Sequence, residues 1–218
     1  MTTAVLNRYS PKEEFLSCLI HGIGIVLGFA AVSILAVFSA IYSDVWSIVS
    51  TSIFGASMIL LYTASTLYHA AKKDSLRRVL KKIDHISIYY LIAGSYTPFM
   101  LVNIRGALGW SIFGIIWGLA IFGTILKLCS DGNGAKKWSI LLYLSMGWLV
   151  VFASHSLFAN LPTIGIVFLV LGGLAYTFGV LFYINKKKAY THAIWHFFVL
   201  LGTILHFFAI LYSCVLYN

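Results

Sequence analysis

The sequence predicts an all-α integral membrane protein in which seven transmembrane helices form one bundle, as a single domain over residues 1–218. Two observations support this fold class. The chain is 61% hydrophobic and only 10% charged, with a mean hydropathy of +0.94, whereas soluble domains carry about 25% charged residues. The charged residues are also grouped, so that they leave long apolar stretches, each able to cross ~30 Å of hydrocarbon.

Short polar breaks divide the chain into seven apolar stretches. Asp44 lies between the first and second, and Arg105 lies between the third and fourth. The stretch 138–185 holds no Asp, Glu, Lys or Arg and is too long for one span, so Pro162 and the residues before it are expected to divide it. Pro98 is expected to kink the third helix. After a short tail at 1–14, the predicted spans are 15–42, 46–71, 83–103, 107–128, 138–159, 163–185 and 191–216.

The distribution of basic residues predicts the orientation. Fourteen of the 15 lysines and arginines lie in the tail and in alternate loops, and only Arg105 lies on the other side. Because cytoplasmic loops retain positive charge, we expect a cytoplasmic N-terminus and an extracytoplasmic C-terminus. The net charge of +9 then comes from basic residues at the helix ends, which would face anionic lipid headgroups. We therefore expect membrane lipids and no nucleic acid as partners, and a multi-pass location in the plasma membrane.

Ionisable residues cluster near the cytoplasmic ends of three spans. An Asp at membrane depth costs about 2.5–3.5 kcal/mol, so such a residue needs a partner or a task. His192 and His196 are four residues apart and share a helix face. With His69 from the second span they can hold a tetrahedral Zn²⁺ whose fourth position is open to water. Asp84, at matching depth, could accept a proton from that water, and Ser65, one turn before His69, could orient a substrate or a ligand.

Each of these residues also has a simpler interpretation. A histidine in a membrane is more often a hydrogen-bonding or interfacial residue than a ligand. Asp84 could extend towards the basic loop beside it, and the Ser65 hydroxyl could bond to its own helix. The metal hypothesis therefore depends on all of these side chains lying at one depth.

The remaining ionisable residues are expected to play supporting roles. Glu14 and His21 share a face of the first helix, which favours a structural role or a contact behind the ligands over direct ligation. His85 is expected at the interface. His155 and His206 are expected to be structural or to form interhelical hydrogen bonds, since His206 lies ten residues, or about 15 Å, beyond His196.

Four ordered blocks of the sequence resemble the bacterial hemolysin III proteins, which belong with the progestin and adipoQ receptors, a group that includes the adiponectin receptors. The blocks run from the tail to the last span. They are Glu13-Glu14 followed by His21-Gly22-Ile23-Gly24; Ser65-Thr66-Leu67-Tyr68-His69; Ile83-Asp84-His85 followed by Ile92-Ala93-Gly94-Ser95-Tyr96-Thr97-Pro98-Phe99; and the segment from His192 through His196 to Gly202.

The resemblance implies a seven-helix bundle with a cytoplasmic N-terminus and a zinc ion inside the membrane near the cytoplasmic side. Three family histidines that hold zinc correspond to His69, His192 and His196. The family aspartate that meets zinc through water corresponds to Asp84, and the family serine corresponds to Ser65. Adiponectin receptors are associated with ceramide hydrolysis, so a lipid amide or ester is the implied substrate class.

Three functions of different classes remain open. The first is a zinc-dependent hydrolase that acts on a lipid carbonyl. The second is a membrane sensor or lipid-homeostasis regulator in which zinc is structural. The third is the pore-forming cytolysin that the family name suggests, although the outer halves of the predicted helices offer few polar residues to line a pore. A di-iron desaturase would need more histidines than lie at this depth, and a bis-histidine haem would make the protein coloured.

Overall fold

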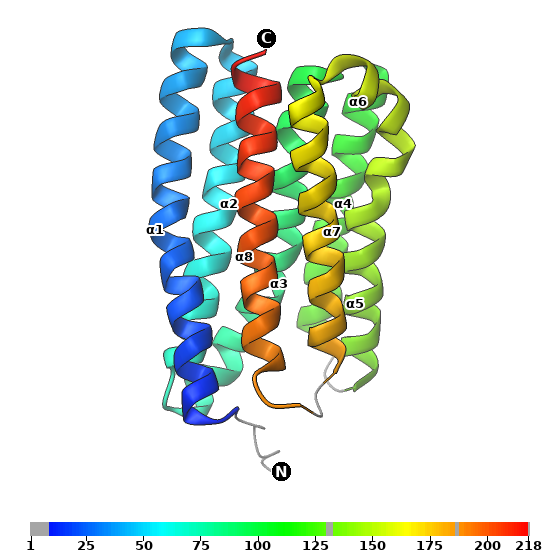
Figure 1. Ribbon diagram of the computed structural model, residues 1–218. Helices are drawn as coiled ribbons and strands as arrows, with labels where there is room; N and C mark the ends of the chain where they lie inside the picture. Colours follow the sequence, from blue (N-terminus) through cyan, green and yellow to red (C-terminus); the bar gives the residue numbers. More distant parts are fainter. Residues whose placement is uncertain (1–8, 130–132, 186–187, 218) are drawn as a thin grey trace.

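The helices form an up-and-down bundle in which consecutive helices pack together and the first closes on the last (Figure 1). This computed structural model describes residues 9–129, 133–185 and 188–217, and every regular element in those ranges is helical. The elements are α1 (Pro11–Tyr42), α2 (Val45–Ala70), α3 (Asp74–Pro98), η1 (Phe99–Asn103), α4 (Ala107–Cys129), α5 (Asn133–Trp148), η2 (Leu149–Ala153), α6 (Ser154–Asn160), α7 (Thr163–Ile184), α8 (Thr191–Ile210) and η3 (Leu211–Val215).

Six helical segments among the described residues are long and apolar enough to cross a membrane. They are α1, α2, α4, the segment Lys137–Asn160, α7, and the segment Thr191–Val215. The expected break at Pro162 separates α6 from α7. The segment Lys137–Asn160 is continuous but passes through a 3-10 turn, η2, between α5 and α6.

Helix α3 differs from the sequence prediction at its start. The basic residues after position 72 were expected in a loop, but α3 begins at Asp74 and includes most of them. Leu76, Leu80 and Ile83 recur at helical spacing, and lysine and arginine are good helix formers, so the helix extends past the apolar stretch. At its other end α3 continues through Pro98 into the π-helical turn η1.

Helix α1 begins with a local cap that brings two carboxylates to the same end of the bundle. The Ser10 side chain accepts a hydrogen bond from the Glu13 backbone N–H (3.3 Å), and Pro11 occupies the first turn, where a missing N–H costs nothing. Glu13 and Glu14 then lie in the first turn, where the helix dipole favours negative charge. Neither side chain is therefore needed for the cap, and both are available to neighbouring helices.

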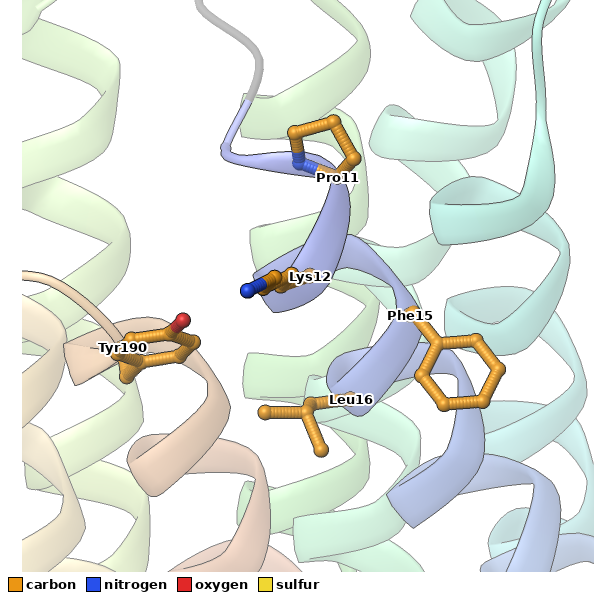
Figure 2. Close-up of a pocket in the computed structure, with 5 residues that line it drawn as sticks. All are labelled: Pro11, Lys12, Phe15, Leu16 and Tyr190. Carbon is orange, nitrogen blue, oxygen red and sulfur yellow. The ribbon is translucent and has the colours of Figure 1, made fainter.

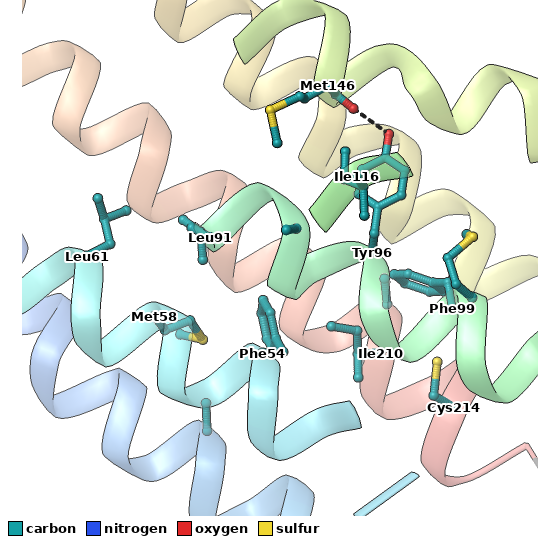
Figure 3. Close-up of a cluster of buried hydrophobic side chains, with 14 of the residues drawn as sticks. Phe54, Met58, Leu61, Leu91, Tyr96, Phe99, Ile116, Met146, Ile210 and Cys214 are labelled. Atoms are coloured by element: carbon teal, nitrogen blue, oxygen red, sulfur yellow. Dashed lines mark hydrogen bonds between the residues drawn. The ribbon is translucent and has the colours of Figure 1, made fainter. Parts of the chain in front are cut away.

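The apolar core lies between α2, α3, α4 and α8 and contains one polar bridge that stabilises the irregular turn η2. The Tyr96 hydroxyl donates to the backbone carbonyls of Met146 (2.8 Å) and Gly147 (2.9 Å) and accepts from the Val150 N–H (2.7 Å), and Figure 3 shows the first of these bonds. Backbone groups freed inside a membrane must find partners within the protein. Tyr96 supplies those partners where the α-helical pattern is interrupted.

Close packing between α1 and α2 depends on a glycine. A Cβ atom added to Gly24 would lie 2.6 Å from the Cγ and Cδ1 atoms of Tyr62, which is too close. Gly22, one half-turn earlier, faces open space. Small residues at such contacts let helix backbones approach closely, which is the main source of helix association in a membrane.

Candidate metal centre

Three histidine side chains meet at the end of the bundle where α1 starts. His69 lies in the last turn of α2, and His192 and His196 lie in the first turns of α8. The Nε2 atom of His196 lies 3.0 Å from Nε2 of His69 and 3.0 Å from Nε2 of His192, and the latter two atoms are 3.3 Å apart. All three side chains are buried. Within the described residues they form a group that could hold a metal ion.

The arrangement of the three Nε2 atoms suits metal ligation better than hydrogen bonding among the three rings. The Nδ1–H groups of His69 and His196 donate to other partners, so their Nε2 atoms carry lone pairs. Lone pairs 3.0 Å apart repel unless a positive charge lies between them. In a tetrahedral site with metal–nitrogen distances of about 2.0–2.1 Å, ligand nitrogens lie ~3.3 Å apart. The observed spacing is close to that value, and imidazole suits several first-row divalent metals.

A carboxylate orients the first of these rings. The Nδ1–H of His69 donates to Glu14 Oε2 (2.6 Å), while Glu14 Oε1 pairs with Arg77 Nη2. Arg77 is only 2% exposed; it also donates to the Tyr68 carbonyl (3.2 Å), and its guanidinium lies over the Tyr68 ring. A carboxylate behind a ligating histidine fixes the tautomer and the ring orientation. The chain from Arg77 through Glu14 to His69 therefore points the Nε2 lone pair of His69 at the other two rings.

The second ring is oriented by another histidine. The Nδ1–H of His196 donates to His21 Nε2 (2.9 Å), and His21 is buried in α1. This bond assigns the remaining His21 proton to Nδ1, an atom that has no hydrogen-bond partner in the structure. His21 thus orients the His196 ring, and its own Nδ1–H is a buried donor without a partner.

Residues from the start of the described chain cover the third ring. The Tyr9 ring stacks on the His192 ring with centroids 4.3 Å apart, and the Tyr9 N–H donates to Glu14 Oε1 (3.2 Å). Glu13 Oε1 accepts the backbone N–H of His192 (3.2 Å). Helix α8 has no side-chain cap of its own after Tyr190, so a carboxylate from α1 satisfies its first turn and meets the positive end of its dipole.

Asp84 and Ser65 lie near this centre but outside the group of ligating side chains. Asp84 is buried, and its Oδ2 lies 3.4 Å from His85 Nδ1. Ser65 is also buried, and its hydroxyl has no hydrogen-bond partner, in contrast to the bond to its own helix that a membrane serine usually makes. Asp84 therefore lies on the same cavity wall as His21, and Ser65 lies one helical turn before His69 with an unpaired hydroxyl.

An apolar cavity of about 300 Å³ lies next to residues that contact the centre, among them His21 and Trp195. At the histidine end its wall includes Asp84, His21, Tyr183 and Trp195, and the Trp195 ring lies 4.7 Å from the His196 ring. The cavity continues between α3, α5, α7 and α8 towards the opposite end of the bundle, lined mainly by aliphatic and aromatic side chains. Pockets for small molecules have this composition, an apolar wall with few polar groups.

A second hollow lies on the outside of the bundle and does not reach the histidines. Figure 2 shows its lining, which consists of Pro11, Lys12, Phe15, Leu16 and Tyr190. Its walls are mostly apolar, and none of the three clustered histidines lines it. The internal cavity, whose lining includes Asp84, His21 and Trp195, is therefore the one that lies next to the metal centre.

The remaining histidines, His85, His155 and His206, lie in different surroundings. His85 Nδ1–H donates to the Lys81 carbonyl (2.7 Å), and its side chain is mostly buried beside Asp84 rather than exposed at the interface. His155 is exposed on α6. His206 is buried, and neither of its ring nitrogens has a hydrogen-bond partner, so of the two roles expected from the sequence the structural one fits and the interhelical hydrogen bond is not formed.

The sequence interpretation missed Arg77, Glu13 and Tyr9. Arg77 was counted only as a loop cation, although it lies seven residues before Asp84 and therefore on the same face of one helix. That spacing could have identified it. No local pattern indicates that Glu13 caps α8, because the two residues in this hydrogen bond are 179 positions apart.

Comparisons with known proteins find relatives that match nearly the whole chain. A family model described as "Haemolysin-III related" matches residues 9–207. The "Hemolysin-3 homolog" of Bacillus subtilis (strain 168) is 43% identical over 210 residues, covering 95% of this chain and 97% of that protein. The "Hemolysin-3" of Bacillus cereus is 40% identical over 201 residues, 92% and 91% of the two chains. The human "Monocyte to macrophage differentiation factor" is 31% identical over 215 residues, 94% and 86%.

Proposed function

Because this chain belongs to the haemolysin-III related family and is a multi-pass protein of the plasma membrane, we propose that it is a zinc-dependent hydrolase of a lipid amide or ester. One observation supports this function above the others. Three imidazole nitrogens converge beside a buried carboxylate at one end of an apolar cavity. Such a cavity accepts an acyl chain, and its polar end would then receive the carbonyl group.

The proposal includes seven crossings with the histidines near the cytoplasm. Helix α3 together with η1 is the third crossing, because from Ile83 to Asn103 its only charged residue is Asp84. The basic residues of its first turns then extend into the headgroups. The N-terminus is cytoplasmic, since among the described residues every lysine and arginine except Arg105 lies towards the end of the bundle where α1 starts.

We assign zinc to His69, His192 and His196. Three neutral nitrogen donors with one open position match the ligand sets of catalytic zinc sites. When bound, zinc would lower the pKa of a water ligand towards neutrality and polarise a carbonyl oxygen. The rest of the chemistry belongs to the side chains around it.

In this proposal Asp84 is the general base. Its buried carboxylate lies on the cavity wall, and it can take a proton from water that attacks the lipid carbonyl and return that proton to the leaving amine or alcohol. The unpaired Ser65 hydroxyl can donate to an oxygen of the substrate. The apolar cavity wall excludes bulk water from the reaction.

Hydrolysis measured beside metal content tests the function. Purified zinc-loaded protein is offered ceramides and other acyl lipids, and Asp84→Asn serves as the matched variant. We expect turnover of at least one acyl lipid by the wild type and a loss of about 10²–10⁴-fold in Asp84→Asn, with zinc content unchanged. Bound zinc without turnover of any acyl lipid would contradict the enzyme and favour the sensor with structural zinc.

The cytolysin named in two of the relatives is the weaker candidate. A conducting pore needs a continuous polar path. In the described residues the cavity walls beyond Asp84 and His21 are predominantly apolar. That composition suits a hydrocarbon chain better than water or ions.

A further inference from the structure

A few of the described buried polar atoms that lack hydrogen-bond partners lie on the wall of the internal cavity. Among the described residues, such atoms that also line the cavity belong to His21, at the histidine end, and to His206, part-way along the wall. His206 is 9% exposed, and both its Nδ1 and Nε2 atoms lack hydrogen-bond partners. Leaving a buried polar group unpaired is energetically costly, so such a group calls for an explanation.

The surrounding residues pack against the His206 ring but form no hydrogen bond with its nitrogens. The ring packs against the backbone of Gly172 on α7, where any larger side chain would collide with it, and it meets the Tyr176 ring edge-on with centroids 5.3 Å apart. The Tyr176 hydroxyl is already engaged with Thr203 Oγ1 (2.8 Å). The backbone of Leu169 is near the ring, but the contact lacks the geometry of a hydrogen bond. A glycine thus makes room for an imidazole that the protein leaves unpaired.

We propose that His206 is a second polar anchor of this cavity and binds a hydroxyl group carried part-way along the acyl chain of the ligand. This inference rests on the proposed function, in which the carbonyl end of the lipid lies at the clustered histidines. A neutral imidazole offers one N–H donor and one acceptor nitrogen. A hydroxyl can pair with either nitrogen, whereas a carbonyl or ether oxygen can only accept. The class of ligand is therefore a hydroxylated acyl lipid rather than a plain or oxo-substituted one.

The helix geometry sets where the hydroxyl should be. His206 follows His196 by ten residues on α8, so the two side chains are about 15 Å apart along the helix axis. A hydroxyl near the carbonyl, or at the far end of a long chain, would miss the ring. We therefore expect a preference that peaks at one mid-chain position.

Competition binding tests this proposal. Purified zinc-loaded Asp84→Asn protein in detergent is incubated with radiolabelled stearic acid, which is displaced by stearic acid, by hydroxystearic acids with the hydroxyl at successive positions, and by the corresponding oxostearic acids. We expect one mid-chain hydroxystearic acid to bind about tenfold more tightly than stearic acid. The oxostearic acid with its carbonyl at the same position should show a smaller gain in affinity over stearic acid.

Three variants separate the role of His206 from general effects. His206→Phe should lose the preference, measured as the ratio of the hydroxystearic to the stearic acid affinity within the same variant, and His206→Gln, which keeps a donor and an acceptor, should retain part of it. His155→Phe, on the exposed surface of α6, should behave like the wild type. Equal affinity for all acids, a preference that survives His206→Phe, an equal gain from the oxo acid, or no binding of any acid would each overturn the proposal. Failure of lipid hydrolysis in the wild type would count against the proposed function and leave this binding preference unaffected.

Discussion

Replacing Glu14 by glutamine tests the metal centre with the smallest structural change. The Glu14 carboxylate accepts from two side-chain donors, His69 Nδ1–H and the Arg77 guanidinium, and its Oε1 also accepts the Tyr9 backbone N–H. A glutamine amide has the same shape but only one oxygen acceptor, and its NH₂ group must face one of these donors. In one orientation His69 loses the bond that fixes its tautomer; in the other, Arg77 faces a second donor while it is only 2% exposed.

We expect the substitution to weaken zinc binding by about 10–100-fold, or about 1.4–2.7 kcal/mol, which is the usual effect of removing a partner behind a ligating histidine. Stability without metal should also fall, by about 1–3 kcal/mol, because one buried donor is left unpaired. Zinc affinity is measured by competition with a chelating dye, and stability by thermal melting of the metal-free protein. The magnitude is moderate because His192 and His196 keep their own positions.

Glu13→Gln is the matched control. Glu13 is the neighbouring carboxylate on α1 and accepts the His192 backbone N–H, which an amide oxygen can accept equally well. We expect its zinc affinity to stay within about threefold of the wild type. If Glu14→Gln and Glu13→Gln bind zinc equally tightly, the carboxylate does not orient His69 and the reasoning is refuted.

Three further outcomes follow from described contacts. His192→Ala should remove the zinc that elemental analysis finds at about one ion per wild-type chain, and full retention would show that this ring is not a ligand. Gly24→Ala should lower stability in thermal melting by about 1–3 kcal/mol, because the added Cβ atom collides with Tyr62. Gly22→Ala, whose Cβ atom meets open space, should leave stability unchanged. Equal melting of the two variants would contradict the close packing of α1 on α2. Arg77→Gln should weaken zinc binding through Glu14, and the double variant with Glu14→Gln should weaken it little further if the two residues act in series.

Helix positions and the convergence of the histidines could be predicted because both depend on simple spacings. Apolar length locates the membrane helices, and the four-residue spacing of His192 and His196 puts both rings on one face. Charge distribution then assigns His69 to the same depth. These inferences need no knowledge of which helices are neighbours, only of which end of each helix faces the same side.

The supporting contacts could not be predicted, because they depend on how the helices pack. The bonds from Glu13 to His192 and from Glu14 to Arg77 join residues 179 and 63 positions apart, and no periodicity relates them. The length of α3 was also underestimated, since a charged segment that continues an apolar helix resembles a loop when only hydropathy is considered. The cavity beside Asp84 depends on which side chains fail to fill space, which the sequence alone does not report.

The separation of the clustered histidines along the chain has a consequence for how the protein is made. His69 and His192 are 123 positions apart, and His192 lies in the first turn of α8. A chain that has been synthesised and inserted only as far as α7 can offer an ion one imidazole of the three, so tight capture must wait until α8 has joined the bundle. Because an ion bound by the complete set stabilises only the state in which α2 and α8 are docked, binding favours chains in which these two helices have packed correctly.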